Sequence, residues 1–222
     1  MLHELLAKIA SKNARLVAVS KTQSAERVLE IYQQAGQRIF GENRPLEMLE
    51  KHAALPADIE WHFIGHLQTN KVKSIAPFVA LIHSVDSLRL LQEIDKQALK
   101  NNRVINCLFQ FHIAQEETKF GLSEQEAVDI LYSPEFAGLQ NVRISGVMGM
   151  ASFTEDSEQV RKEFRTLKTI FDHLRVKFFL QSAHFREISM GMSGDWRIAL
   201  EEGSTLVRIG SLIFGERSPH LK

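Results

Sequence analysis

Short hydrophobic runs alternate with longer amphipathic segments along nearly the whole chain. Eight of these runs are rich in β-branched or other apolar residues, and each is short enough to be a buried strand. The eight runs are Leu16–Ser20, Arg38–Gly41, Trp61–Ile64, Val79–Ser84, Val104–Phe111, Ile144–Met148, Glu187–Met190 and Leu206–Ile209. The pattern therefore predicts eight strands.

The segments between the runs have helical spacing. Hydrophobic residues recur every three or four positions in 25–32 and again in 160–171, which places them on one face of a helix. A further helix, about Leu2 to Ala10, is predicted before the first strand. Ser123 and Glu126 fit a capping box. The residues expected at helix starts are Ser24, Asp86, Ser123 and Ser157.

Strands that alternate with helices indicate βαβ units and a parallel sheet. The strands begin about every 27 residues, and eight such units are the number that closes an α/β barrel of the (β/α)8 or TIM type. We predict a single barrel domain over residues 1–222, with its last element ending near Arg217. A doubly wound open sheet is the alternative, but the glycine-rich fingerprint expected after its first strand is absent.

Composition narrows the function class. The 222 residues are 44% hydrophobic and 24% charged, which is typical of an ordered globular protein. Lys and Arg number 27, as do Asp and Glu, so the charge excess expected of a nucleic-acid or anionic-membrane binder is missing. One cysteine, Cys107, excludes an internal disulfide and suits a reducing compartment. No signal peptide or membrane-spanning run is evident, so a soluble cytoplasmic protein is expected.

A lysine at the end of the first strand is the sharpest candidate for chemistry. In a (β/α)8 barrel, the residues that follow the strands gather at one mouth. Lys21 is such a residue, and strand alternation puts it on the same face as Val17 and Val19. Burial there lowers the pKa of a lysine and lets its amine form a Schiff base. A solvated lysine at a strand end is the alternative interpretation.

The last two strands end in segments that suit a phosphate group. Strand seven leads into Met190–Asp195, which holds two glycines and precedes a helical stretch from Trp196. Glycine lets the backbone approach an anion, and a helix start offers free N–H groups. Strand eight adds Arg208 and Gly210 on one face, and an arginine fork matches phosphate. Barrels often bind phosphate with these two loops, so the segments together predict a phosphate site.

Histidines offer a different function class, a metal-dependent hydrolase. Those near strand ends are His62, His66, His83 and His112. The spacing of four between His62 and His66 suits a helix, but here it crosses a strand end, and no carboxylate-rich site accompanies it. We therefore predict no metal site. Cys107 lies inside an apolar strand and is interpreted as a small buried hydrophobe.

Six segments resemble the pyridoxal phosphate homeostasis protein family, in the family's order and over nearly the whole chain. They are LVAVSKT (Leu16–Thr22), FGENR (Phe40–Arg44), WHFIGHLQTNK (Trp61–Lys71), QEETKFG (Gln115–Gly121), SMGMSGDWRIAL (Ser189–Leu200) and GSTLVRIGSLIFGER (Gly203–Arg217). The resemblance implies a (β/α)8 barrel like the N-terminal domain of alanine racemase, with pyridoxal 5′-phosphate (PLP) bound to a lysine. His66 and His112 stand where many relatives have proline and asparagine.

The resemblance also assigns roles to particular residues. It implies that Lys21 carries PLP as a Schiff base, that Asn43 lies near the ring, and that the loops after strands seven and eight hold the phosphate. Whether Arg208 faces the phosphate or the pyridine nitrogen stays open, and the neighbouring Gly210 favours the phosphate. The residues expected around the cofactor are Lys21, Asn43, Met192, Ser193, Arg208 and Gly210.

Family members are thought to buffer PLP, to maintain vitamin B6 and amino-acid pools and to hand PLP to apo enzymes, without defined turnover. The residues favour the same interpretation, because a PLP racemase needs a second acid–base group, typically a tyrosine from a partner's extra domain. No such domain is expected here, and Tyr32 and Tyr132 fall in predicted helices away from the mouth. We predict a monomeric PLP carrier; the alternative is a slow racemase or lyase that uses Lys21 alone as its base.

Overall fold

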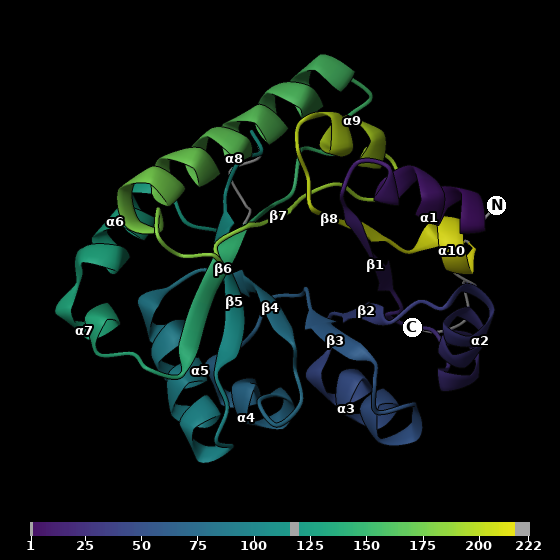
Figure 1. Cartoon of the computed structure of the whole chain (residues 1–222), viewed down its shortest axis with the longest axis horizontal. Coiled ribbons are helices and arrows are strands. Elements are labelled where there is room, and N and C mark those ends of the chain that lie inside the picture. Colours follow the sequence, from purple (N-terminus) through teal and green to yellow (C-terminus); the bar gives the residue numbers. More distant parts are fainter. Residues whose placement is uncertain (1, 116–119, 216–222) are drawn as a thin grey trace.

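The computed structural model describes residues 2–115 and 120–215. In this part of the chain, eight parallel strands hydrogen-bond in sequence order into a closed barrel, which Figure 1 shows surrounded by helices. The predicted α/β barrel is confirmed. The strands are β1 (Arg15–Val19), β2 (Ile39–Glu42), β3 (Glu60–Phe63), β4 (Leu81–Val85), β5 (Ile105–Phe111), β6 (Val142–Gly149), β7 (Glu187–Ser189) and β8 (Leu206–Ile209).

The helices pack outside the barrel, so each strand is covered on its outer face (Figure 1). The predicted first helix is confirmed as α1 (Leu2–Ala10). The others are α2 (Ala25–Ala35), α3 (Pro45–Ala54), η1 (Thr69–Lys71), α4 (Val72–Ile75), α5 (Leu88–Lys100), α6 (Glu124–Tyr132), α7 (Pro134–Ala137), α8 (Ser157–Phe178), α9 (Trp196–Glu201) and α10 (Ser211–Phe214). The predicted end near Arg217 and positions 116–119 of the QEETKFG motif lie outside the described residues.

Two of the expected helix caps are confirmed. The Ser24 hydroxyl accepts a hydrogen bond from the backbone N–H of Arg27 at the start of α2. Ser123 and Glu126 form the predicted capping box at the start of α6, because each side chain accepts the other residue's backbone N–H. Both arrangements satisfy N–H groups that have no partner inside their helix.

The other two caps were predicted one residue away from their true positions. Helix α5 is capped by Ser87, not Asp86, and the Ser87 hydroxyl accepts the N–H of Leu90. Helix α8 is capped by Asp156, not Ser157. In each case Asp and Ser are adjacent and both residue types cap helices well, so only the path of the backbone decides which one does.

Seven of the eight predicted strands differ from the observed ones at one or both ends, mostly by one residue, and two of them begin two residues away from prediction. Strand β4 begins at Leu81 rather than Val79, because the N–H of Val79 still bonds to the carbonyl of Ile75 in the turn after α4. Strand β6 begins at Val142 rather than Ile144 and pairs with β5 from there. The prediction started the strand too late because the charged Arg143 interrupts the hydrophobic run. Backbone hydrogen bonds between β5 and β6 do not require an apolar side chain at that position.

The core has two layers. A small cluster fills the barrel interior, and a much larger one lies between the strands and the surrounding helices. Cys107 belongs to the outer layer and is fully buried, as predicted. The interior cluster consists of Val17, Ile39, Leu81, Leu108, Met148 and Leu206. This packed plug separates the two ends of the barrel, so each end can form its own cavity.

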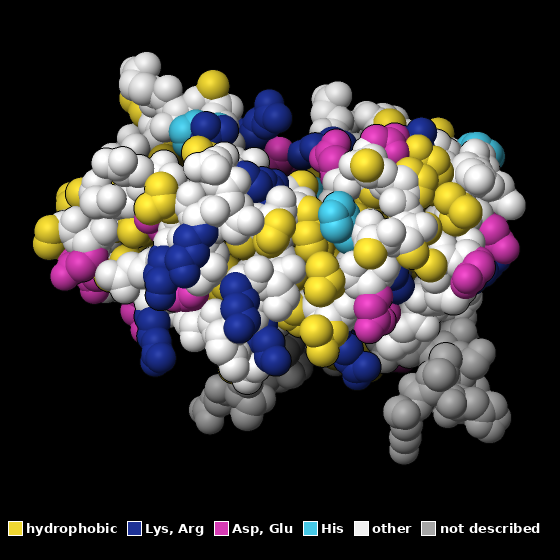
Figure 2. All heavy atoms as spheres, turned by 90° about the horizontal axis from the view of Figure 1, so that it is seen from below, with side chains coloured by type: hydrophobic (Ala, Val, Ile, Leu, Met, Phe, Trp, Pro, Cys, Tyr) yellow, Lys and Arg dark blue, Asp and Glu magenta, His cyan; other side chains and the backbone are white. Residues whose placement is uncertain are grey.

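The outer surface carries charges of both signs. Figure 2 shows Lys and Arg, Asp and Glu, and hydrophobic side chains interspersed over one face, in keeping with the equal totals of the two charge types. Among residues 2–115 and 120–215, no helix is both long enough and apolar enough to cross a membrane.

Candidate cofactor site

A cavity of about 500 Å³ opens at the carboxyl ends of the strands. Its wall is partly apolar, with Val19, Ile64, Met150 and Phe214 among the lining residues. The cavity brings together all six residues expected around the cofactor, although they come from distant parts of the chain. Those residues are Lys21, Asn43, Met192, Ser193, Arg208 and Gly210.

Lys21 is partly buried and follows directly after Ser20, the first residue beyond β1. Two hydrogen bonds hold Ser20. Its hydroxyl donates to Oε1 of Glu42 at 2.7 Å, and its carbonyl accepts from Nζ of Lys51 at 2.7 Å. The backbone on the amino-terminal side of Lys21 is therefore held by side chains from β2 and α3.

The backbone on the other side of Lys21 is held as well. The N–H of Thr22 donates to Oε1 of Glu47 at 2.5 Å, and Thr22 has a positive φ of 66°. Glu47 accepts a further hydrogen bond from Lys51 at 2.7 Å. A single network thus clamps both neighbours of Lys21 and determines the direction in which its side chain leaves the backbone.

The centre of this network is a buried ion pair. Nζ of Lys51 lies 2.7 Å from Oε1 of Glu42, and the two side chains are 6% and 0% exposed. Burial raises the pKa of Glu42, and the charge of Lys51 opposes that rise. The second oxygen, Oε2 of Glu42, is buried and has no hydrogen-bond partner among the described residues. Losing Lys51 would therefore leave a buried carboxylate without its counter-charge.

Asn43 follows β2 and lines the cavity. Its Oδ1 atom is buried and has no hydrogen-bond partner among the described residues. Gly65 packs against it so closely that a Cβ there would lie 2.7 Å from the backbone oxygen of Asn43. Only glycine leaves room for this placement, and the unpartnered oxygen is a feature that a bound ligand can satisfy.

The loops after β7 and β8 contact each other at the cavity. The N–H of Gly210 donates to the hydroxyl of Ser193 at 3.4 Å, and the N–H of Met192 donates to Oδ1 of Asp195 at 2.5 Å. A Cβ on Gly210 would lie 3.1 Å from the carbonyl of Val19. The two loops therefore form one cradle in which backbone atoms approach the cavity directly.

Arg208 lies at the floor of the cavity and is only 5% exposed. Its Nη1 donates to the hydroxyl of Ser189 at 2.6 Å, and its Nη2 donates to the carbonyl of Gly149 at 3.1 Å. Burial lowers its pKa to about 10, so the guanidinium stays charged at neutral pH. Its hydrogen bonds run to the ends of β6 and β7 and not to the loop at 192–194.

The histidines weighed above as a rival metal site do not gather around one point. His62 and His83 are buried together inside the barrel, whereas His66 stacks on Phe120 and lies 3.5 Å from Asp86. Among the described residues, no group of three or more His, Cys, Asp or Glu side chains is placed to hold a metal ion.

Neither tyrosine lines the cavity. Tyr32 donates from its hydroxyl to Asp58, and Tyr132 contacts Phe178 edge-on. The expectation that both lie in helices away from the mouth is confirmed.

Sequence reasoning missed two ionisable residues of the site. Asp195 lines the cavity, and burial raises its pKa while Arg208 and the N–H of Met192 oppose the rise. Asp195 lies in the glycine-rich loop after β7, but a carboxylate repels a phosphate, so a predicted phosphate site gave no reason to select it. Lys51 is buried on α3, and no local signal in the sequence marks it as buried.

Comparisons with known proteins identify the family of this chain. The model of the alanine racemase N-terminal domain family matches residues 3–218. The pyridoxal phosphate homeostasis protein of Aquifex aeolicus (strain VF5) is 44% identical over 206 residues, which cover 92% of this chain and 87% of that protein.

Two solved structures place the fold. PipY of Synechococcus elongatus PCC7942, solved with PLP bound, has a TM-score of 0.84 at 33% identity, over 97% of this chain and 100% of PipY. An alanine racemase of Clostridium difficile 630 has a TM-score of 0.71 at 14% identity, over 97% of this chain and 59% of the racemase, a likeness that shows the fold alone. The chain therefore belongs to the pyridoxal phosphate homeostasis protein family and has the barrel fold of the alanine racemase N-terminal domain.

Proposed function

We propose that this chain binds PLP in the cavity at the carboxyl ends of the strands and acts as a PLP carrier and buffer. The observation that carries the proposal is the convergence of Lys21 with the Ser193–Gly210 cradle on one cavity. The PLP-bound structure of PipY and the name of the Aquifex relative support it.

The described residues suit the chemical groups of PLP. The cavity of about 500 Å³ falls within the range of roughly 300–1,000 Å³ usual for small-molecule sites. Its apolar wall suits an aromatic ring, and the unpartnered Oδ1 of Asn43 offers a polar contact. The cradle at Ser193 and Gly210, with the first turn of α10 beside it, offers hydroxyl and N–H donors to a phosphate.

Lys21 supplies the covalent attachment in this proposal. Lys21 would hold PLP when it is bound, because an uncharged amine condenses with an aldehyde to a Schiff base with loss of water. The network of Ser20, Glu42 and Lys51 holds the backbone beside Lys21, so the amine reaches the cavity in a fixed direction. A group held in place in this way reacts faster than a freely rotating one.

We further propose that Arg208 faces the ring and not the phosphate. Its guanidinium is hydrogen-bonded to Ser189 and Gly149, away from the cradle at Ser193. An arginine donates hydrogen bonds and does not accept them. Arg208 therefore favours the unprotonated form of the PLP pyridine nitrogen over the protonated form. Such a ring withdraws electrons more weakly than a protonated one.

The ionisable groups of the cavity also favour a carrier. Among the described lining residues, those that ionise are Lys21, Asp195 and Arg208. Asp195 accepts the N–H of Met192, and Arg208 keeps its proton, so neither is a ready partner for Lys21 in moving protons. A slow racemase or lyase that uses Lys21 alone is the second candidate, because the same amine can serve as a base.

Borohydride reduction tests the attachment, since it makes a Schiff base permanent. We expect mass spectrometry of the reduced, digested protein to locate the modification on Lys21, and we expect Lys21→Ala to lose both the modification and the yellow colour. Lys73→Ala, which removes an exposed lysine outside the cavity, is the matched control and should keep both. Modification of another lysine in the wild-type protein would overturn the assignment.

A further inference from the structure

Four buried polar side chains form a continuous chain of hydrogen bonds inside the barrel. They come from β3, β4, β7 and β8 and are those of His62, His83, Ser189 and Arg208. Their exposed fractions range from 0% to 5%. Strands β4 and β7 are not neighbours in the sheet, so the contact between His83 and Ser189 crosses the barrel interior. Burying several polar groups costs stability unless each finds a partner, so the chain calls for an explanation.

One end of this chain lies at the proposed PLP site. Arg208 lines the cavity at the carboxyl ends of the strands, which we call the upper cavity. Its Nη1 donates to the hydroxyl of Ser189 at 2.6 Å, and that hydroxyl lies 2.8 Å from Nδ1 of His83. Nε2 of His83 in turn lies 3.0 Å from Nδ1 of His62.

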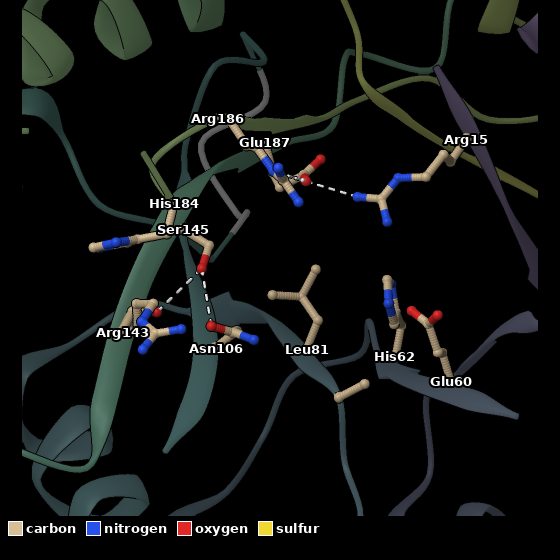
Figure 3. A pocket seen from close by; sticks show the side chains of 11 residues that line it. Arg15, Glu60, His62, Leu81, Asn106, Arg143, Ser145, His184, Arg186 and Glu187 are labelled. Atoms are coloured by element: carbon tan, nitrogen blue, oxygen red, sulfur yellow. Dashed lines mark hydrogen bonds and ion pairs between the residues drawn. The ribbon is translucent and has the colours of Figure 1, made fainter. Parts of the chain in front are cut away.

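The other end of the chain lies at a second cavity, of about 270 Å³, where the strands begin. The lining of this lower cavity is mostly polar and includes three arginines, Arg15, Arg143 and Arg186. Figure 3 shows the side chain of His62 at this cavity. The hydrogen bonds therefore span the barrel from one cavity to the other.

Both histidines of the chain are uncharged at neutral pH. Burial lowers the pKa of His62 to about 3, and burial lowers the pKa of His83 well below its ordinary value. Each ring then carries one proton, so one of its nitrogens donates and the other accepts. The protons of the chain can consequently point in only two ways, either from Arg208 toward His62 or in the reverse order.

Arg208 decides between the two directions, because a guanidinium can only donate. Since Arg208 donates to the hydroxyl of Ser189, that hydroxyl can pass its own proton on to Nδ1 of His83. The proton of His83 is then on Nε2 and is donated to Nδ1 of His62. The proton of His62 is consequently on Nε2, the ring nitrogen that takes no part in the chain.

The reverse direction leaves a buried group unsatisfied. If Nδ1 of His83 donated to Ser189, the serine hydroxyl would accept twice, and its own proton would find no acceptor among the described residues. Ser189 is fully buried, and a buried hydroxyl proton without an acceptor carries the full cost of its desolvation. The direction from Arg208 to His62 is therefore the stable one.

This direction turns the lone pairs of the Ser189 oxygen toward a buried cation. Within residues 2–115 and 120–215, the hydrogen-bond partners of Arg208 are Ser189 and the carbonyl of Gly149, and it forms no ion pair there. The carboxylate of Asp195 favours its charge from farther away. Hydrogen bonds aligned in one direction polarise one another, so the two histidines strengthen the bond between Arg208 and Ser189.

We propose that Ser189 is a positioning residue of the upper cavity, and that His83 and His62 set the direction of its hydroxyl. Ser189 does not line the upper cavity itself. It acts through Arg208, whose guanidinium it fixes before a ligand enters, and that ligand is PLP if the proposed function holds. A side chain that is already fixed loses little rotamer freedom on binding. Removing the hydroxyl should therefore weaken PLP binding.

Nitrogen NMR of the PLP-free protein tests the chain without any ligand. We expect the proton of both rings on Nε2, with His62→Gln and His83→Gln used to assign the signals. A proton on Nδ1 of His83 in the wild type would overturn the inferred direction. This measurement uses the wild type, so it decides the direction even where a variant folds poorly.

The guanidinium signals of Arg208 test the positioning, again without PLP. In the wild type, Nη1 and Nη2 should give separate signals, because a held guanidinium rotates slowly, and in Ser189→Ala the two should average. Ser204→Ala is the matched control, since it removes another buried hydroxyl that is hydrogen-bonded beside β7 and β8, and its spectrum should match the wild type. Separate signals in Ser189→Ala would show that Ser189 does not fix Arg208.

Equilibrium dialysis with PLP measures the consequence for binding. Ser189→Ala should raise the Kd for PLP about fivefold, the order expected when one more side chain must be immobilised, while Ser204→Ala should not. In an Arg208→Met background, Ser189→Ala should have no further effect, because the residue through which it acts is gone. An equal fivefold loss in that background would contradict the proposal. A wild type that binds no PLP would refute the proposed function, while the two NMR measurements would still decide the role of Ser189.

Discussion

At the scale of single residues, the site depends on side chains that never touch the cavity. Lys51 lies behind Lys21 and contacts Ser20, Glu42 and Glu47 at 2.7 Å each. These contacts hold the turn from which Lys21 emerges, so Lys51 is a positioning residue. Its effect on PLP should be indirect and should accompany a change in stability.

We expect Lys51→Met to lower the free energy of unfolding by about 3 kcal/mol, because it leaves the buried Glu42 carboxylate without its counter-charge. Urea unfolding measures the loss, and Lys73→Met at an exposed position is the control. The double variant Lys51→Met with Glu42→Gln should recover part of the stability, since it removes the charge itself. A loss below about 1 kcal/mol in Lys51→Met would contradict this account.

The buried histidines predict how stability depends on pH. Burial lowers the pKa of His62 from an ordinary 6.5 to about 3, so between these values the unfolded chain binds a proton that the folded chain refuses. The contribution of His62 to stability is therefore complete above pH 6.5 and is lost as the pH falls toward 3. At pH 5 the loss from this one group is about 2 kcal/mol.

Urea unfolding at pH 7 and pH 5 checks this prediction. The free energy of unfolding should fall less between these two pH values in His62→Gln than in the wild type, because the variant has no proton to bind there. His3→Gln, at an exposed position, should behave like the wild type. Identical pH dependence in His62→Gln and the wild type would show that His62 titrates normally in the folded protein.

At the scale of elements, the barrel is least secured around β7. This strand has three residues, and its ladder to β8 consists of one residue pair, Ser189 with Leu206. Its other neighbour, β6, comes close at Gly146, where a Cβ would lie 1.8 Å from the carbonyl oxygen of Glu187. Gly146 also has a φ of 150°, so the pairing of β6 with β7 requires glycine there.

Gly146→Ala should therefore lower the free energy of unfolding by roughly 3 kcal/mol, through both the clash and the backbone conformation. Thermal and urea unfolding measure the effect. Gly138→Ala is the matched control, because its Cβ would find nothing closer than 3.5 Å, and it should change stability little. An unchanged free energy of unfolding in Gly146→Ala would mean that β6 and β7 can move apart without destabilising the protein.

Helix starts show how far local pattern reaches at this scale. The capping box of Ser123 and Glu126 was predictable, because its spacing is specific. At Asp156 and Ser157 the sequence offered two good caps side by side, and the backbone placed the aspartate where it accepts two N–H groups. A local pattern thus locates an element to within a residue or two, while packing determines where its first turn begins.

At the scale of the whole molecule, the two ends of the barrel present different side chains. The upper cavity holds Lys21 and the cradle at Ser193, and the lower cavity holds the arginines, with an apolar plug between them. The chain spans 59% of the alanine racemase it resembles in fold. Besides Lys21, the ionisable residues among the described lining of that cavity are Asp195, which accepts the N–H of Met192, and Arg208, which keeps its proton, so we expect the barrel to keep PLP available and not to act on amino acids.

We therefore expect the PLP-loaded protein to give up its cofactor to an apo PLP-dependent enzyme while turning over no amino acid itself. A positioned acid or base contributes about 10²–10⁴-fold to a rate, so without one the racemisation of L-alanine should stay near that of free PLP. Recovery of activity in the acceptor enzyme and chiral chromatography of alanine measure the two results. Free PLP at the same concentration is the control. Turnover in the range of ~1–10³ s⁻¹ would favour the enzyme alternative.

The sequence alone determined the barrel and most of the upper site. Strand and helix periodicity is local, so eight βα repeats could be counted along the chain, and the closed barrel follows from that number. Once the strands are known, the residues after them must meet at one mouth, which is why Lys21, Asn43 and the cradle residues could be named in advance.

Only the tertiary structure decided which polar side chains are buried and what they contact. Lys51 is a charged residue that is buried on α3, and only the packing of α3 against β2 shows that it contacts a buried carboxylate. Four buried side chains from four strands meet inside the barrel, namely those of His62, His83, Ser189 and Arg208. They meet because the register of the strands sets their positions along the barrel axis. The periodicity of the sequence predicts which face of a strand a residue occupies. The partners of that residue across the barrel depend on the closure of the sheet into a barrel, which brings together residues that are far apart in the chain.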